Sequence, residues 1–302
     1  MGEEERENGK HPLECISIEE AGRLRFLTGA STLDHALGGG IPPGIVEVSG
    51  PESSGKTTLA MSIMREADLR RFQTAYISCS KPNPEYMRKA GPRECLCVSP
   101  GSAESAFDAA FKLVDAGVRV IVIDTITAML PHVDRHRPLN EGETPFAMRR
   151  LAFHALSHLE PKLSESGSLL VVLSEVRQKI GRGYPSSPMD GTIDSICGIR
   201  MSTSKIKTRT EFGDFSYLKF GMRIKQSKFC PPGQTAEAFI WKDGINRSFE
   251  LMRLLLATNI LEVRGSRIMG PDGISLGPGL LKAAQQIEES FQRFFSMTHL
   301  GR

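Results

Sequence analysis

The segment Gly50-Pro51-Glu52-Ser53-Ser54-Gly55-Lys56-Thr57 decides the fold class of this chain, because it fits the pattern G-x-x-x-x-G-K-[ST]. An apolar run, Ile45–Ser49, precedes it, and a stretch of helical periodicity follows it. In such a loop the glycines let backbone N–H groups face a β-phosphate, the lysine reaches the β- and γ-phosphates, and the threonine hydroxyl ligates Mg²⁺. The start of the following helix adds its dipole to this site. The sequence therefore predicts binding of ATP or GTP together with Mg²⁺.

An acidic residue at the end of a later strand extends this prediction. Asp124 closes the apolar run Val118–Asp124. At the carboxyl end of a strand, such a carboxylate can hold the water shell of Mg²⁺. An acidic residue after an apolar strand is common, so Asp124 supports a nucleotide site only in combination with the phosphate loop upstream. We predict that Thr57 and Asp124 together bind the metal ion.

Short β-branched runs alternate with longer helical segments along much of the chain, which indicates βαβ units and a parallel sheet. The strand-like runs are Ile45–Ser49, Ala75–Cys79, Val118–Asp124 and Leu169–Ser174, and the helical segments are Lys56–Leu69, Ala103–Ala116 and Phe146–Leu163. After residue 196 the strand-like runs follow one another without a helix, as Cys197–Thr203, Phe215–Lys225 and Ala236–Lys242. We therefore expect an α/β fold whose mostly parallel sheet continues in antiparallel strands.

The composition is typical of a globular protein, with 302 residues, 40% hydrophobic and 24% charged residues, and a net charge of +3. No run approaches the ~20 apolar residues of a membrane helix, and the acidic start does not resemble a secretory signal. We expect a cytoplasmic protein without membrane association. Three parts are predicted: an acidic flexible segment (1–24), a nucleotide-binding core (25–248) and a small C-terminal α/β lobe (249–302), with helices at Phe249–Thr258 and Gly279–Phe295.

Six cysteines are present, and the only close pair is Cys95-Leu96-Cys97. No matching pair or histidine cluster completes a zinc site. Because Cys79 and Cys97 lie in apolar, strand-like runs, we interpret the cysteines mainly as small buried thiols. A redox or metal-binding role is the less favoured alternative.

Several segments together resemble the core of the bacterial RecA recombinase family. They are Thr28–Gly40, Gly50–Thr58, Asp124–Pro131, Ser174–Gly181 and Lys242–Asn246, and the likeness spans roughly residues 25–302. This resemblance implies a RecA-like P-loop NTPase core that binds ATP and Mg²⁺. It also implies an ATP site completed between adjacent subunits of a filament, formed by this chain alone or with another RecA-like protein. Two mobile loops would hold single-stranded DNA.

The resemblance also suggests individual site residues. Tyr86 matches a tyrosine that stacks on adenine, Asn83 stands where the family has an aspartate for the adenine edge, and Thr58 extends the phosphate loop. Lys225 matches one of two lysines that reach a neighbouring subunit's γ-phosphate. The two DNA loops correspond to about 132–145 and 181–196, and the candidate DNA-binding residues in and beside them are Arg135, Arg137, Arg177, Lys179, Arg182 and Tyr184.

The chain departs from the family pattern where ATP would be hydrolysed. Ser80 stands in place of the glutamate that activates water, and Glu175 in place of the glutamine that senses the γ-phosphate. The second lysine that acts on a neighbour falls on Ser227, and a lysine and a phenylalanine near the end of the second loop become Asp194 and Ser195. Phosphate binding needs the loop and the metal, whereas turnover needs an oriented water and stabilised transition-state charge. We therefore predict ATP binding with slow or absent hydrolysis.

Lys56 and Glu175 are the candidate catalytic residues. Glu175 could replace the missing carboxylate from another strand end, because both positions face the crevice at the carboxyl edge of the sheet. The alternative is that Glu175 is a solvated or arginine-paired surface carboxylate.

Basic residues are concentrated between Arg177 and Lys228, where eleven cations oppose four acidic residues and Lys205–Arg209 is the densest stretch. Cations beside a glycine-rich loop suit a nucleic-acid backbone, and Tyr184 could stack on a base. The alternative is a solvated strand edge that resists aggregation. The favoured function is a RecA-like, single-stranded-DNA-binding protein of recombination and repair. The alternatives are a non-catalytic accessory paralogue that regulates a recombinase filament or damage-tolerance complex, and a signalling ATPase.

Overall fold

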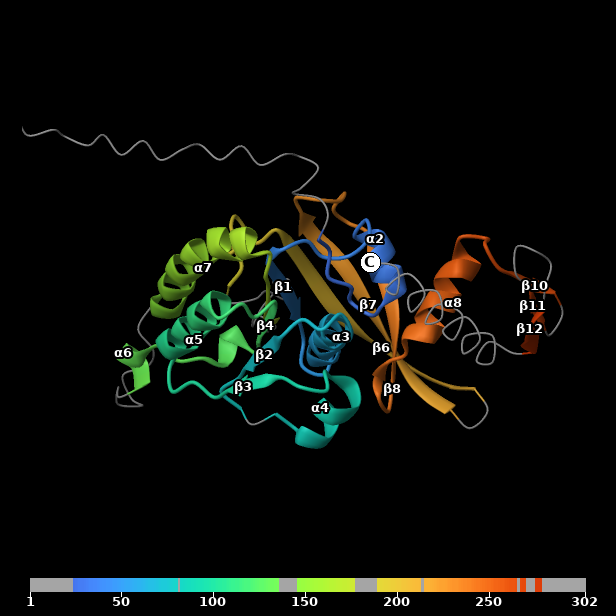
Figure 1. Ribbon diagram of the computed structural model, residues 1–302, viewed down its shortest axis with the longest axis horizontal. Helices are drawn as coiled ribbons and strands as arrows, with labels where there is room; N and C mark the ends of the chain where they lie inside the picture. The colour runs from blue at the N-terminus through green and yellow to red at the C-terminus, as the bar shows by residue number, and fades with distance from the viewer. Residues whose placement is uncertain are drawn as a thin grey trace, which may run out of the picture.

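A nine-stranded sheet runs through the molecule in the order β3-β2-β4-β5-β1-β6-β7-β8-β9 (Figure 1). The computed structural model describes residues 24–80, 82–135, 146–176, 189–212, 215–264, 267–269 and 275–278. Neighbouring strands are parallel from β3 to β6 and antiparallel from β6 to β9, which confirms the predicted α/β class. The strands of this sheet are β1 (Gly44–Gly50), β2 (Thr74–Ile77), β3 (Leu96–Val98), β4 (Val120–Ile123), β5 (Leu169–Glu175), β6 (Ile199–Phe212), β7 (Phe215–Ser227), β8 (Thr235–Trp241) and β9 (Gly244–Ile245).

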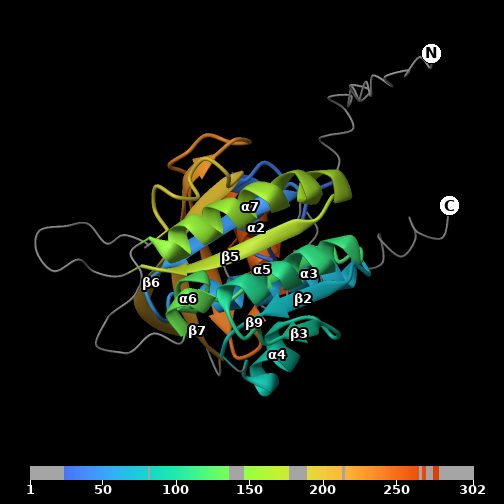
Figure 2. The same cartoon turned by 90° about the vertical axis from the view of Figure 1, so that its left-hand side faces the viewer.

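Helices cover both faces of the parallel part of the sheet (Figure 2). One apolar cluster joins the sheet to α2 (Ser31–Ala36), α3 (Lys56–Leu69) and α4 (Pro84–Ala90), and the other joins it to α5 (Ala103–Asp115) and α7 (Ala147–Ser166). Side chains of β1 alternate between the clusters, since Val46 and Val48 enter the first and Ile45 the second. Strands buried on both faces explain the continuous apolar runs in the sequence. A 3₁₀ turn (Ile126–Ala128) and the short α6 (His132–Arg135) follow β4.

The helix after the phosphate loop has the bounds that its periodicity predicts, Lys56–Leu69. The largest difference from the sequence prediction is in β6, which continues beyond Thr203 to Phe212 and pairs with β7 along a long hairpin. Only Ile199–Ser202 of β6 also pair with β1, so the hairpin extends past the central sheet. Antiparallel partners satisfy each other's backbone groups, which lets β6 run through the polar residues where the apolar pattern ends.

The chain after the main sheet begins with α8 (Arg247–Ala257), which packs on β8. Phe239, Phe249, Met252, Leu261 and Ile268 form one buried cluster there. A second, three-stranded sheet comprises β10 (Glu262–Arg264), β11 (Arg267–Met269) and β12 (Ser275–Pro278). The predicted helix Gly279–Phe295 and residues 1–23 lie outside the described residues. Within the described residues, no helix is long and apolar enough to cross a bilayer.

Two cysteines differ from the prediction of buried thiols. Cys79 and Cys97 are exposed, because β2 ends before Cys79 and β3 is the edge strand of the sheet. Cys197 is buried as expected, and burial raises the pKa of its thiol to about 12. The Sγ atoms of Cys95 and Cys97 lie 3.5 Å apart. The described residues contain no group of three or more His, Cys, Asp or Glu side chains that could hold a metal ion.

Candidate nucleotide-binding site

The phosphate loop crosses from the end of β1 to the start of α3, and close contacts require its two glycines. A Cβ atom at Gly50 would lie 2.2 Å from Thr203 Oγ1. A Cβ atom at Gly55, whose φ is +87°, would lie 3.1 Å from the Phe220 ring. The Ser54 and Thr203 hydroxyls share a hydrogen bond of 2.6 Å. Strands β6 and β7 therefore anchor the loop, while residues 51–53 face solvent.

Lys56 lies inside the curve of this loop. Its Nζ donates to the carbonyl oxygens of Gly50 at 3.0 Å and Pro51 at 2.8 Å. Burial lowers the pKa of Lys56, and the charges of Glu175 and Asp124 act in the opposite direction. The geometry thus places one cation among backbone groups at a helix start, which is the arrangement that recognises phosphate.

Thr57 and Asp124 meet as predicted for a metal site. Thr57 Oγ1 donates to Asp124 Oδ2 at 2.8 Å. A hydroxyl and a carboxylate fit Mg²⁺, which prefers oxygen ligands and binds through one or two carboxylates, water and substrate phosphates. These two residues would hold the ion, and it would bridge and neutralise the phosphates of ATP.

Tyr76, which no sequence motif points to, contacts the same carboxylate. The Tyr76 hydroxyl donates to Asp124 Oδ2 at 2.6 Å from the neighbouring strand β2. Burial and the nearby Asp124 charge raise the pKa of Tyr76 well above its ordinary value. A buried tyrosine hydroxyl needs a partner. Tyr76 precedes Asp124 by 48 residues, so its position could be read from the sequence only after pairing β2 with β4.

Glu175 ends β5 directly beside the phosphate loop, where it pairs in register with Gly50. Its backbone N–H donates to Thr127 Oγ1 at 3.1 Å, which ties the end of β5 to the turn after β4. Glu175 is half-buried, and its charge opposes the lowering of the Lys56 pKa that burial causes. Glu175 therefore lies at the carboxyl edge of the sheet, on the side where the phosphates would bind.

The predicted adenine residues belong to α4. Asn83 Oδ1 accepts from the backbone N–H groups of Glu85 at 3.0 Å and Tyr86 at 3.1 Å, so it caps the helix. The Tyr86 and Thr58 hydroxyls share a hydrogen bond of 2.5 Å. Asn83 thus positions Tyr86, and Tyr86 contacts the helix that begins at the phosphate loop.

Comparison with known proteins agrees with this geometry. The family model described as the RecA N-terminal domain matches residues 3–246. The chain belongs to the RecA family. The protein RecA of Crocosphaera subtropica is 30% identical over 300 residues, which cover 95% of this chain and 84% of that relative. The protein RecA of Caldanaerobacter subterraneus subsp. tengcongensis is 32% identical over 273 residues, covering 87% and 79%.

A solved structure shares the fold at lower identity. The crystal structure of the RadB recombinase superposes with a TM-score of 0.55 and 22% identity, covering 73% of this chain and 98% of RadB. Together with the family match, this confirms the RecA-like core that the motifs predict. As a member of the RecA family, the chain has a RecA-like role in recombination and repair.

Ser80 lies where the RecA-like pattern predicts the water-activating glutamate. Its side chain is exposed just beyond β2, and its hydroxyl lies 3.2 Å from the Ser78 hydroxyl. The Ser80 backbone N–H also donates to Ser78 Oγ at 3.3 Å. These two neutral side chains hydrogen-bond to each other just after β2, the strand that pairs with β4 before Asp124.

The remaining predicted residues are only partly described. Lys225 Nζ donates to Ser49 Oγ of the same chain at 3.2 Å, next to the phosphate loop. Arg135 is exposed at the end of α6, and its charge lowers the pKa of Cys79 against the larger effect of burial. The segment predicted as the first DNA loop thus begins near Cys79, just beyond the end of β2. The other predicted DNA-binding residues, Arg137, Arg177, Lys179, Arg182 and Tyr184, lie outside the described residues.

Proposed function

We propose that this RecA-family chain binds ATP with Mg²⁺ and single-stranded DNA in recombination and repair, and that it hydrolyses ATP slowly or not at all. The observation that carries the proposal is the contact of Thr57 with Asp124 beside the buried Lys56, together with the neutral Ser80. These residues would supply the groups that hold phosphates, and the neutral Ser80 stands where the family pattern has its activating carboxylate.

Binding of ATP and Mg²⁺ requires only groups that a single chain supplies. The Gly50–Thr57 backbone and Lys56 would hold the β- and γ-phosphates, and Thr57 and Asp124 would hold the metal ion. Turnover also requires a carboxylate or amide that orients the attacking water. A hydroxyl at Ser80 is a poor base, so the barrier for attack stays high. Glu175 is the candidate to take over this role, because it ends β5 in register with Gly50 at the start of the phosphate loop.

Single-stranded DNA is the proposed partner because of charge. The stretch from Arg177 to Lys228 carries eleven basic and four acidic residues, and cations beside a glycine-rich stretch suit a phosphate backbone. The proposed loops leave the sheet at its carboxyl edge, after β4 and β5, on the side of the phosphate loop. DNA and ATP would thus bind near the ends of the same strands.

Nucleotide titration and ATPase assays test this proposal. Lys56→Ala should weaken binding of a fluorescent ATP analogue by about tenfold or more, because a charge-assisted hydrogen bond contributes about 1.5–3 kcal/mol. Lys89→Ala, an exposed cation paired with Glu85, serves as the control and should bind normally. Wild-type hydrolysis should stay near background with and without single-stranded DNA. Rapid DNA-stimulated hydrolysis in the wild type would contradict the weak-ATPase part of the proposal.

Two further variants separate the possible bases. If the missing glutamate is the main defect, Ser80→Glu should gain DNA-stimulated turnover. If Glu175 carries the residual activity, Glu175→Gln should abolish it, and an unchanged rate would exclude that role. The Ser78–Ser80 contact favours one alternative function, an accessory paralogue that binds ATP structurally. Filaments that form on DNA only with a second recombinase present would support it, and filaments formed alone would exclude it.

A further inference from the structure

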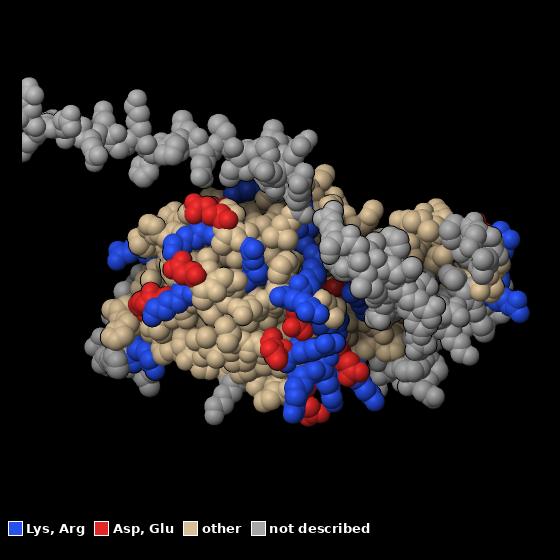
Figure 3. Space-filling view, viewed as in Figure 1, with Lys and Arg blue, Asp and Glu red and all other residues tan. Residues whose placement is uncertain are grey.

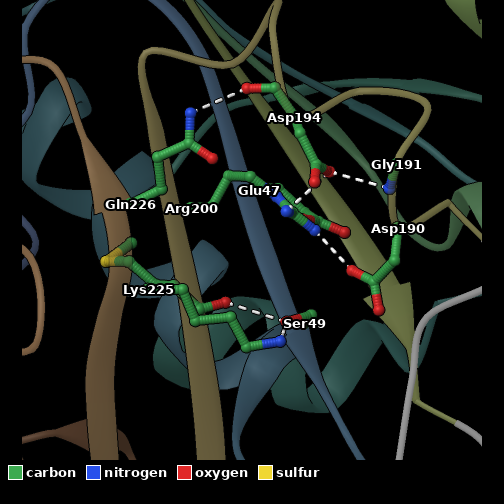
Figure 4. Close-up of polar contacts among 9 residues, drawn as sticks. Glu47, Ser49, Asp190, Gly191, Asp194, Arg200, Lys225 and Gln226 are labelled. Atoms are coloured by element: carbon green, nitrogen blue, oxygen red, sulfur yellow. Dashed lines mark hydrogen bonds and ion pairs between the residues drawn. The ribbon is translucent and has the colours of Figure 1, made fainter.

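One guanidinium on the sheet meets three carboxylates, in a group that we name the Arg200 cluster: Arg200, Glu47, Asp190 and Asp194 (Figure 4). Arg200 Nε donates to Glu47 Oε2 at 2.6 Å. Its Nη2 donates to Asp190 Oδ1 at 2.5 Å, and its Nη1 lies 2.6 Å from Asp194 Oδ1. Each of the three guanidinium nitrogens thus faces a different carboxylate, and the planar guanidinium fixes the direction of each partner.

Burial divides this cluster into two parts. The Glu47 side chain is 0% exposed and that of Arg200 is 7% exposed, so they form a buried pair between β1 and β6. The Asp190 and Asp194 side chains remain 34% and 42% exposed. Removing one member of a buried pair leaves an uncompensated charge, whereas partly exposed carboxylates can be removed with far less effect on folding. The buried Arg200–Glu47 pair therefore supports folding, whereas Asp190 and Asp194 can be removed with little loss of stability.

Both aspartates belong to the short segment 189–198, which forms the end of the predicted second loop (about 181–196) and continues into β6. Within it, the Gly191 N–H donates to Asp194 Oδ1 at 3.0 Å. Gln226 Nε2 on β7 donates to the Asp194 carbonyl at 2.8 Å. Met189, Ile193 and Cys197 are buried against the sheet face that α7 also covers. This segment is thus held by ion pairs, a tight turn and apolar contacts at once.

The same contacts reach the strand that carries the phosphate loop. Glu47 lies on β1, in register with Arg200 and three residues before Gly50. Two residues after Glu47, Ser49 accepts from Lys225 at 3.2 Å and donates to the Met201 carbonyl at 3.0 Å. Figure 4 shows Lys225 and Gln226 on the strand beside Arg200. The end of the loop segment and the start of the phosphate loop therefore share one rigid part of the sheet.

We propose that Asp190 and Asp194 are positioning residues for DNA binding, which act through Arg200 to fix where the second loop joins the sheet. The proposal rests on the proposed binding of single-stranded DNA. Two carboxylates at the end of a DNA-binding loop would otherwise weaken binding by repelling phosphates. Paired with Arg200, they hold the loop segment in one orientation relative to β1. Their positioning effect and their charge effect on DNA affinity therefore have opposite signs.

Because the two effects have opposite signs, the DNA affinity of a variant without these carboxylates shows which effect is larger. The double variant Asp190→Ala/Asp194→Ala should bind a labelled oligothymidine less tightly with Mg²⁺ and a non-hydrolysable ATP analogue present. The expected loss in DNA affinity is about two- to thirtyfold, the size of effect that residues without ligand contact have on a coupled site. The slope of log affinity against log salt should become shallower, because loop cations lose phosphate contacts. Asp194→Glu keeps the carboxylate and should retain most of the affinity. Asp115→Asn, an exposed partner of Lys162, is the matched control and should bind normally.

The outcomes separate the two proposals. If the double variant binds DNA as tightly as the wild type or more tightly, the charge effect prevails and the positioning role is wrong. If the wild type itself binds no single-stranded DNA, the proposed function fails and the positioning role fails with it. The melting temperature and the ATP-analogue affinity of the variant should remain close to wild type, because the Arg200–Glu47 pair is intact. If the double variant is unstable, the nearly isosteric Asp190→Asn provides the same comparison.

Discussion

Asp124 accepts two hydrogen bonds on one oxygen, from Thr57 at 2.8 Å and from Tyr76 at 2.6 Å. A metal ion attracted to that oxygen competes with both donors. Tyr76→Phe removes one donor, so the Mg²⁺ concentration for half-maximal binding of an ATP analogue should fall. The lost hydrogen bond should also cost about 1 kcal/mol of unfolding free energy. Titrations of Mg²⁺ and of denaturant measure the two effects.

Tyr217→Phe is the control for this prediction, because Tyr217 lies among the aromatic rings of β8 and α8. It should leave the Mg²⁺ requirement unchanged. A rise in the Mg²⁺ requirement of Tyr76→Phe would instead mean that Tyr76 holds the carboxylate in the orientation the metal needs.

At the scale of single elements, α4 has seven residues and depends on its first turn. Asn83 Oδ1 accepts two backbone N–H groups there, and Pro84 begins the helix. Asn83→Ala should lower the unfolding free energy by about 1 kcal/mol, the usual cost of losing an N-cap. It should also weaken ATP binding, because Tyr86 loses its fixed position. Asn83→Asp keeps the acceptor and should match the wild type in thermal unfolding; equal losses in both variants would show that capping is not the cause.

The elements also show which features a sequence can predict. The phosphate loop and α3 follow from local rules, because glycine spacing, helix periodicity and the apolar β1 all lie within a few turns of chain. Tyr76 and Arg200 could not be assigned in this way, since their partners come from distant strands. The exposed Cys97 was mispredicted for a related reason. An apolar run predicts a strand, but does not reveal that β3 ends the sheet.

At the scale of the whole molecule, two carboxyls with raised pKa values, the half-buried Asp34 and the buried Glu250, should make stability depend on pH. Burial raises the pKa of Asp34 to about 7 and that of Glu250 to about 8. Asp34 accepts from the Thr28 N–H at 2.8 Å and Glu250 from the Phe239 N–H at 2.8 Å. Both raised values mean that folding favours the protonated form. This contribution to stability is complete below the unfolded pKa values near 4 and is lost as pH rises through about 7 and 8.

The double variant Asp34→Asn/Glu250→Gln should therefore melt at nearly the same temperature at pH 5.5 and pH 8.5, apart from shifts that other groups cause. The amides keep the acceptor oxygens and remove the titration. The wild type and the exposed control Asp115→Asn should both lose melting temperature over that interval. An equal loss of melting temperature in the double variant would show that other groups cause the pH dependence.

The cationic surface is also a property of the whole molecule. Figure 3 shows lysine and arginine side chains gathered on the face that carries α3 and α4, with acidic side chains among them. Exposed residues there include Arg70, Arg71, Lys89, Arg93 and Lys242, while Asp68, Glu85 and Glu94 are interspersed. Mixed charges of this kind suit solvation.

The central position of β1 has a consequence for how the chain is made. Its partners are β5 and β6, and its contacts with Met201 and Arg200 span 152 and 153 residues of sequence. During synthesis from the N-terminus, β1 leaves the ribosome long before either neighbour exists. Pairings this distant also form slowly, because closing the intervening chain costs entropy. We expect a nascent chain that ends before residue 202 to contain every phosphate-loop residue and still bind no nucleotide.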